Sequence, residues 1–374
     1  MRRTWLAIPI LLAAAACAPD NDPDPDPMPS IETSAVPRSA SLCGSAAVAS
    51  IDRNRLEIAS FEDGDLTPVK LELPADAKAE PDRSWRAAVH CASTDDGPIA
   101  VVTYGWATEG AVGFGEDAVV GMFGLELDGT TAWYHELRRS QTVRTVADAV
   151  MLTDDPAMSD KEPRTTVLDA ATGQVVVDKQ RLPQATPIDT DRMAYGTDEP
   201  VLATTANEPI AEPDTSGLSW VAGGGVAVLT GEHEITAYDA ESGDELWSVP
   251  AEGQSGLSGE VDTDAGVLLT TTTLLGPDTP AIEGEESDTT LSGIDLETGE
   301  ILWSREFGDS YVSGDKHADG GMFGVGIDHY ESRTGDPLTL PDKPFVIPFD
   351  AGPHGLLVLD NGAYRVLSLD ELRG

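Results

Sequence analysis

The chain has 374 residues, of which 66 are Asp or Glu and 23 are Lys or Arg, so its formal net charge at pH 7 is −43. A field of that sign repels polyanions, which excludes DNA and RNA as partners and removes charge attraction to anionic lipid headgroups. The length is ample for one large repeat architecture or for two ordinary domains.

The first 16 residues predict a lipoprotein signal peptide. A short basic start is followed by an apolar stretch, Trp5–Ala16, which is too short to cross a bilayer as a mature helix. Ala14-Ala15-Ala16 directly before Cys17 resembles a bacterial lipobox, where the cysteine takes fatty acids such as palmitate and becomes the N-terminus. The resemblance departs at Ala14, where Leu is commonest. An ordinary secretory signal is the alternative, and either general or twin-arginine export is compatible with the two arginines.

Residues 17–40 predict an acidic tether. Asn21-Asp22-Pro23-Asp24-Pro25-Asp26-Pro27 cannot form a packed core, because it has no apolar side chain that could anchor one. The alternating prolines keep such a segment extended, and its like charges stretch it further. We expect lipid on Cys17 to hold the protein at the extracytoplasmic side of the cell membrane.

The other two cysteines, Cys43 and Cys91, predict a disulfide in an oxidising compartment. The bond would close a loop of about 48 residues, worth about 2–4 kcal/mol. A metal site is the weaker alternative, because no histidine stands at ligand spacing and His90 points to the other face of a strand from Cys91.

The rest of the chain reads as an all-β protein with internal repeats. Short runs of Val, Leu, Ile, Thr and Tyr are broken by Gly, Asp and Pro. Residues 235–247 and 291–303 each contain an alternating strand, an Asp, a turn that ends in Gly, and a second strand that reaches a Trp. Asp with Ser or Thr caps such a turn, and Gly takes its positive φ. Further copies occupy 166–177, 124–133 and, in degenerate form, 329–335.

These repeats resemble the PQQ-like (quinoprotein-type) β-propeller repeat of quinoprotein dehydrogenases and BamB-type lipoproteins. The match is strongest over 225–307. It implies that residues 41–374 form one all-β propeller domain with seven or eight four-stranded antiparallel blades. In such repeats the hairpin is the outer part of a blade and the Trp packs between blades. We therefore expect Trp133, Trp247 and Trp303 to be interblade packing residues and not a ligand cage.

Candidate blades follow from the spacing of the repeats. They lie near 43–74, 84–138, 143–182, 187–206, 218–250, 256–307, 310–342 and 345–374. Ring closure is expected to pair Leu42–Ser50 with Tyr364–Leu369, which would hide two sheet edges. Asp278–Asp288 is predicted to be a long loop and Asn207–Thr215 an acidic connector.

No catalytic, cofactor-binding or metal-binding residue is predicted. The quinoprotein dehydrogenases carry adjacent cysteines, a calcium site and a catalytic Asp, but this chain has no Cys-Cys pair and is far shorter. Asp262–Gly266 lacks the later ligand of a calcium loop and is interpreted as a β-turn. The six histidines show no metal spacing and no Gly-x-Ser-x-Gly occurs. Carboxylate pairs for sugar chemistry remain open, because 66 acids guarantee chance pairs.

The sequence therefore favours a non-catalytic, lipid-anchored cell-surface scaffold that works as a monomer without a cofactor. Its partner would be an envelope or surface protein, whose identity the repeats do not encode, since they specify blade packing. The alternatives are a quinoprotein-type oxidoreductase, a sugar-acting propeller enzyme and a solute-binding module.

Overall fold

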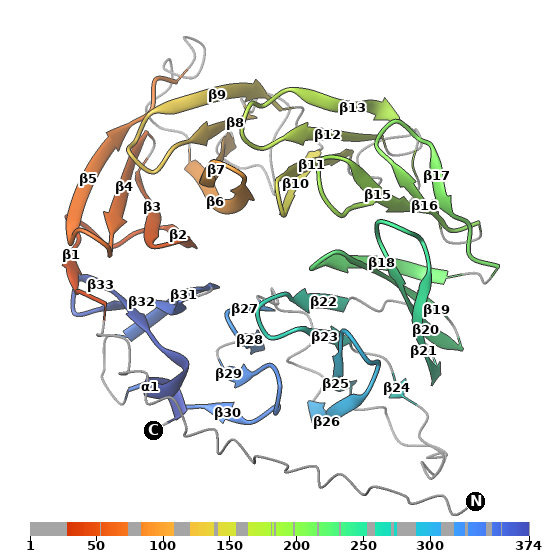
Figure 1. The fold of residues 1–374 in the computed structure, drawn as a ribbon. Coiled ribbons are helices and arrows are strands. Elements are labelled where there is room, and N and C mark those ends of the chain that lie inside the picture. Colours follow the sequence, from red (N-terminus) through yellow and green to blue (C-terminus); the bar gives the residue numbers. More distant parts are fainter. Residues whose placement is uncertain are drawn as a thin grey trace, which may run out of the picture.

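A computed structural model of the chain shows an all-β propeller of eight blades arranged in a ring (Figure 1). It describes residues 28–373, except 53, 74–83, 108–119, 138–140, 155–163, 181, 183–184, 197–198, 215–216, 232, 253–258, 271–272, 275–288, 308–317, 326–327, 342–345 and 353. The predicted fold class is confirmed, and the choice between seven and eight blades is settled as eight. The described residues contain one helix, α1 (Leu369–Arg373).

Each of the first seven blades is built from consecutive antiparallel strands, beginning with the innermost. Blades 1 to 3 consist of β2 (Ser39–Cys43), β3 (Ala46–Asp52), β4 (Arg55–Ser60) and β5 (Asp65–Lys70); β6 (Ser84–Thr94), β7 (Gly97–Ala107), β8 (Val120–Leu125) and β9 (Thr131–Glu136); and β10 (Gln141–Val146), β11 (Ala149–Asp154), β12 (Thr165–Asp169) and β13 (Val175–Gln180). Blades 4 and 5 consist of β14 (Thr186–Pro187), β15 (Arg192–Tyr195), β16 (Val201–Thr204) and β17 (Pro209–Ala211); and β18 (Gly217–Gly223), β19 (Val226–Gly231), β20 (Glu234–Asp239) and β21 (Glu245–Glu252).

The remaining blades follow the same scheme with two differences. β24 (Thr273–Leu274) interrupts the strand order of blade 6, and blade 8 takes its outermost strand, β1 (Ile31–Glu32), from the N-terminal part of the chain. Blades 6 to 8 consist of β22 (Gly259–Asp262), β23 (Val267–Thr270), β25 (Thr289–Asp295) and β26 (Ile301–Phe307); β27 (Ala318–Asp319), β28 (Met322–Val325), β29 (Asp328–Glu331) and β30 (Pro337–Leu338); and β31 (Val346–Gly352), β32 (Gly355–Asp360), β33 (Ala363–Leu367) and β1. β24, which lies between β23 and β25 in the chain, pairs with β21 as a fifth strand of blade 5.

The predicted blade limits lie close to the observed ones, but two expectations need correction. The predicted connector Asn207–Thr215 contains β17, which pairs with β16 as the outermost strand of blade 4. Pro209 is tolerated in that strand because an outermost strand has one edge with no ladder to break. The predicted loop Asp278–Asp288 lies outside the described residues.

Ring closure differs from the expectation in its strand. Leu42–Ser50 does not pair with the C-terminal strand; instead Ile31 pairs with Tyr364 and Glu32 with Ala363 (Figure 1). The propeller thus begins before the expected start at 41, and β1 completes blade 8 from the other end of the chain. Glu32 is the last residue of β1, and the segment after it is fixed to blade 1.

A buried carboxylate makes that connection. Glu57 of β4 accepts hydrogen bonds from Thr33 Oγ1 at 2.5 Å, from Ser34 N at 3.2 Å and from the Ser34 hydroxyl. Tyr364 of β33 donates to the same carboxylate at 3.4 Å. Glu57 is 3% exposed, so these donors supply the hydrogen bonds that water would otherwise give. We call Glu57, Thr33, Ser34 and Tyr364 the closing latch.

The apolar core is divided among the seams between blades. One cluster joins Val48 and Leu56 of blade 1 to Val102 and Phe123 of blade 2. The predicted disulfide is confirmed in that seam: Cys43 of β2 is bonded to Cys91 of β6, with 5.3 Å between their Cα atoms. Neighbouring blades are therefore held by apolar burial and, at this seam, by a covalent bond.

Candidate functional site

Two kinds of turn lie together on one side of the ring. In blade 5, the turn after β20 is hydrogen-bonded to the turn after β18, from Ala240 N to Gly225 O at 2.9 Å. The same bond recurs in blades 1, 3, 6 and 7, as Phe61 to Ser45, Ala170 to Asp148, Leu296 to Gly266 and Ser332 to Gly321. We call this side the turn face, and the opposite side, where second strands connect to third strands and blades connect to each other, the loop face.

The repeat Asp fixes each outer turn. Asp239 Oδ1 accepts from the backbone N of Ser242 at 2.7 Å and from its hydroxyl at 2.9 Å. The backbone bond first, and then the hydroxyl, hold the pKa of Asp239 below its ordinary value. Gly243 follows with φ of 76°, a conformation that suits Gly. The same geometry occurs at Asp169 with Thr172 and at Asp295 with Thr298.

The three predicted Trp residues lie in the seams. Each indole N–H donates to a carbonyl in the outer turn of the next blade: Trp133 to Ala170 at 2.7 Å, Trp247 to Leu296 at 2.8 Å and Trp303 to Ser332 at 2.8 Å. The rings cover the glycines of those turns. A Cβ added at Gly299 would lie 2.8 Å from the Trp247 ring. These indoles are used in packing and present no ligand cage.

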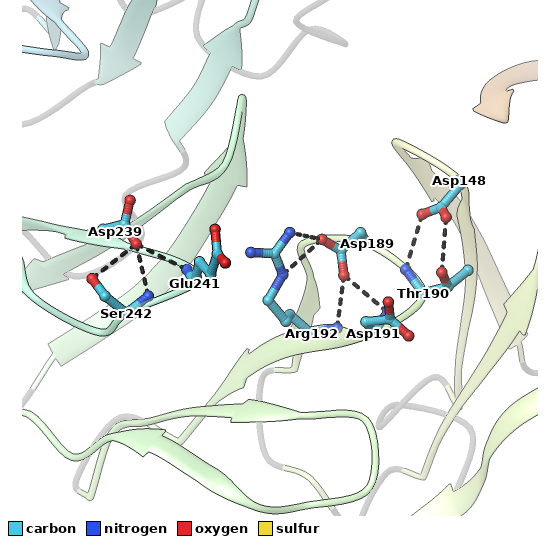
Figure 2. A network of polar contacts seen from close by, with 8 residues as sticks. All are labelled: Asp148, Asp189, Thr190, Asp191, Arg192, Asp239, Glu241 and Ser242. Atoms are coloured by element: carbon cyan, nitrogen blue, oxygen red, sulfur yellow. Dashed lines mark hydrogen bonds and ion pairs between the residues drawn. The ribbon is translucent and has the colours of Figure 1, made fainter. Parts of the chain in front are cut away.

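A polar network crosses the turn face from blade 3 to blade 5 (Figure 2). Asp148, in the turn after β10, accepts from Thr190 N at 2.9 Å and from Thr190 Oγ1 at 2.8 Å. Thr190 belongs to the turn after β14, so these bonds join blades 3 and 4. These polar bonds add to an apolar cluster in the same seam, where Met151 and Val167 of blade 3 pack with Met193 of blade 4.

Arg192 is the cation of this network. Its Nε and Nη2 donate to Asp189 Oδ2 at 2.9 and 2.5 Å. The hydrogen bond to Asp189 is the main cause that raises the pKa of Arg192, and the charges of Asp189, Glu241 and Asp191 add to it, against some desolvation. Glu241 belongs to the outer turn of blade 5, so Arg192 also acts across the seam between blades 4 and 5 (Figure 2). Four carboxylates, those of Asp189, Asp191, Asp239 and Glu241, interact with one guanidinium, so the network is anionic and its cation is already paired.

The predicted turn Asp262–Gly266 connects β22 to β23. Asp262 is fully buried and accepts from Ser332 Oγ of blade 7 at 2.6 Å and from Ala265 N at 3.0 Å. Burial raises the pKa of Asp262, against the hydrogen bond from Ser332. This carboxylate therefore joins two blades. Among the described residues, no three His, Cys, Asp or Glu side chains are grouped to hold a metal ion.

A small pocket of about 130 Å³ opens beside the closing latch. Its walls include Leu56, Val69 and Glu57, with Arg55 and Lys70 nearby. The Glu57 carboxylate is already taken up by the latch, and the volume holds only a few heavy atoms. Ser34 also lines the pocket and belongs to the latch, because its hydroxyl donates to Glu57.

Cys17 lies outside the described residues, so its lipidation stays a prediction. No helix in the part of the chain that the structure describes has the length and apolarity to span a membrane. Sequence reasoning missed two polar centres, Arg192 and Glu57. Asp189 accepts from the backbone N–H groups of Asp191 and Arg192, and an Asp at the start of such a turn is a signal that could have been found. Nothing local marks Glu57, because its donors come from elsewhere in the chain.

A family model matches part of the chain. The PQQ-like family model described as outer membrane protein assembly factor BamB matches residues 202–316. The resemblance inferred from the repeats is confirmed over that range. No curated protein sequence matches the chain.

Two solved structures are similar to this chain over most of its length. BamB from Moraxella catarrhalis is 11% identical, with a TM-score of 0.47 over 90% of this chain and all of that one. The dihydro-heme d1 dehydrogenase NirN is 13% identical, with a TM-score of 0.42 over 82% of this chain and 66% of that one. At these similarities the comparison concerns architecture and assigns no activity.

Proposed function

We propose that the protein is a non-catalytic scaffold, held to the outside of the cell membrane by lipid on Cys17, which binds another envelope protein. One observation carries the scaffold role: the acids brought together across seams are used to join blades. Asp148, Asp262 and Glu57 each accept donors from a neighbouring blade or from the closing segment. A residue engaged in this way maintains a rigid ring.

A rigid ring suits recognition of a large partner. Because its apolar seams and fixed turns are already ordered, the ring loses little conformational entropy when it binds a partner, and this favours affinity. The matched family is described as an outer membrane protein assembly factor, and this description supports a protein as the partner rather than a small solute. The net charge of −43 favours a partner with a basic surface.

Crosslinking on intact cells, followed by affinity purification and mass spectrometry, tests the proposal. The expected result is one envelope protein that is recovered with the native chain and is reduced with Cys17→Ser, because that variant loses its membrane position. Recovery of no specific neighbour contradicts the scaffold role. A bound-quinone absorbance band after incubation with PQQ and Ca²⁺, reduced by an alcohol or a sugar, would instead show an oxidoreductase.

A further inference from the structure

A two-residue turn of blade 8 lies on the loop face, beside the strand that closes the ring. It joins β32 to β33 through Asn361 and Gly362, and Asp360 pairs with Ala363 at its base. Asn361 has φ of 52° and Gly362 has φ of 83°, the left-handed conformations that a type I′ hairpin turn requires. Both residues are exposed, and a Cβ added at Gly362 would meet nothing within 4 Å. The turn is therefore open to water.

An Asn followed by Gly is the sequence in which a backbone nitrogen most readily attacks the preceding side-chain amide. Gly has no Cβ that could obstruct the approach of its own nitrogen. The Gly362 N–H donates no hydrogen bond among the described residues, so none of its bonds has to break before it reacts. The attacking nitrogen and the attacked amide thus stand next to each other on an exposed turn.

We propose that Asn361 is a site of spontaneous deamidation and that its conversion loosens the closure of the ring. In the reaction, the Gly362 nitrogen loses its proton and forms a bond to Cγ of Asn361, and the side-chain nitrogen leaves as ammonia. Water then opens the resulting five-membered succinimide at one of its two carbonyls. The product is an aspartate, or an isoaspartate whose backbone runs through the former side chain. One water is consumed and one ammonia is released, with no oxidation or reduction.

The other asparagines that the structure describes lack this arrangement. Asn54 is followed by Arg and Asn207 by Glu, and those side chains obstruct attack by the backbone nitrogen. Their amides are also engaged: Asn54 Nδ2 donates to a backbone carbonyl at 3.4 Å, and Asn207 Oδ1 accepts from the Tyr195 hydroxyl at 2.7 Å. Asn361 is therefore expected to react first.

Loss of the amide changes the charges at the turn. Asn361 Nδ2 donates to Asp360 Oδ1 at 2.7 Å. Asp360 is 8% exposed, and its other oxygen accepts from Arg365 at 2.9 Å. An aspartate at position 361 replaces the donor with a second carboxylate, and Arg365 is already shared with Glu371 at 3.6 Å. Because like charges so close together repel, the turn is expected to move until they separate.

That turn also supplies a hydrogen bond of the ring closure. β1 pairs with β33 over two residues (Figure 1), and Thr33 N then donates to Gly362 O at 3.0 Å. Since the ladder is so short, this bond is a substantial part of the attachment of β1. An isoaspartate inserts one extra backbone carbon directly before Gly362, which displaces the accepting carbonyl. Both products therefore act on β1 and on the closing latch that follows it.

Peptide mapping tests the site. The purified full-length protein is incubated at mildly alkaline pH, which favours the deprotonated backbone nitrogen, and is then digested. Fragmentation mass spectrometry locates each amide that has become an acid and distinguishes aspartate from isoaspartate. The expected result is conversion at Asn361 while Asn54 and Asn207 remain amides. Conversion at Asn361 that is no faster than at the other two overturns the assignment.

Hydrogen exchange tests the consequence. In the incubated protein and in freshly made Asn361→Asp, the peptide that contains β1 and Thr33 should exchange about two- to tenfold faster than in the fresh native protein, as expected for the loss of one hydrogen bond. A peptide from β20 in blade 5 should not change. Asn361→Ser is the control, because it has no amide to lose and its exchange should be the same before and after incubation. Unchanged exchange at β1 in the incubated native protein or in Asn361→Asp, or an equal rise in incubated Asn361→Ser, overturns the link to ring closure.

Discussion

The seam between blades 5 and 6 and the seam between blades 8 and 1 both have an apolar core, but they differ in the hydrogen bonds added to it. In the former, Trp247 covers the turn glycine Gly299 and donates to Leu296 O. All of these residues belong to two adjacent repeats. In the latter, the closing latch brings Thr33 and Tyr364, which are 331 positions apart, to one buried carboxylate.

The difference shows what a repeat can and cannot encode. A repeat specifies its own hairpin and the residue that meets the next copy, so its seam is apolar and local. In a ring, one seam joins the last blade to the first, and these two are not adjacent in the sequence. In this protein, the hydrogen bonds of the closing latch select the segment that closes that seam. Substitutions at the two seams should therefore differ in how much they lower the free energy of unfolding and in the interaction that they remove.

The largest effect is expected from Trp247→Ala. The change leaves a cavity in the seam between blades 5 and 6 and an unpaired carbonyl at Leu296, so the free energy of unfolding should fall by about 3–5 kcal/mol. Urea titration followed by circular dichroism measures it. The neighbouring Leu246→Ala is the control: Leu246 is 44% exposed, and its loss should cost about 1 kcal/mol or less. Similar losses for the two variants would contradict the seam role of Trp247.

The next largest effect concerns the covalent tie between blades 1 and 2. Replacing both Cys43 and Cys91 with Ala releases a bond that spans 48 positions. The unfolded chain gains loop entropy, and stability should fall by about 2–4 kcal/mol. Thermal unfolding under oxidising and reducing conditions checks this, because the reductant should lower the native midpoint and leave that of the double variant unchanged. If the reductant leaves the midpoint of the native protein unchanged, the disulfide does not contribute this stability.

Glu57→Ala tests the closing latch. Thr33, Ser34 and Tyr364 lose a buried acceptor, and we expect a loss of about 2–3 kcal/mol. Tyr364→Phe removes one donor and should cost about 1 kcal/mol. In urea titrations the double variant should lose less than the sum, because both changes break the same bonds. Additive losses would show that the tyrosine and the carboxylate do not act together.

Gly299→Ala separates backbone strain from close packing. Gly299 has φ of 73° and its added Cβ would lie 2.8 Å from the Trp247 ring. Gly266 has φ of 63° but open space around such a Cβ. Gly266→Ala should therefore cost about 1–2 kcal/mol for left-handed backbone alone, and Gly299→Ala measurably more in the same titration. Equal losses of stability for the two variants would show that the close approach of the Trp247 ring to Gly299 adds nothing to the cost.

The smallest effect is the pH dependence caused by Asp262. Burial raises its pKa in the folded state, so the folded protein binds a proton more readily than the unfolded chain. Its contribution to stability is complete below the unfolded value of about 3.9 and is lost as pH rises through the folded pKa. Asp262→Asn removes this titration. Urea midpoints measured from pH 4 to pH 7 should show the native protein losing stability relative to the variant as pH rises, and parallel curves would contradict the assignment.

The sequence predicts those parts of the fold that are local. The Asp, Ser or Thr and Gly of each outer turn, and the Trp that follows, lie within about a dozen residues, so their pattern identified blades, turns and seams. The latch was missed because Ile31–Glu32 stands next to a Pro- and Asp-rich segment and has no repeat around it. β17 was missed because Pro209 resembles a connector residue, although an outermost strand tolerates it. The Arg192 network was missed because its bonds and charges span three blades.

The pairing of β1 with β33 also determines the order of events when the chain folds. The strand that completes blade 8 is synthesised before every other strand described, and β33, with which it pairs, is the last. The ring stays open until blade 8 has been made, and the edge of β33 then stays uncovered until β1 pairs with it. A contact between chain ends is slow to form, and an uncovered edge invites foreign strands. For this protein, the hazard of misassembly is therefore concentrated in the interval between synthesis of its last blade and capture of its first strand.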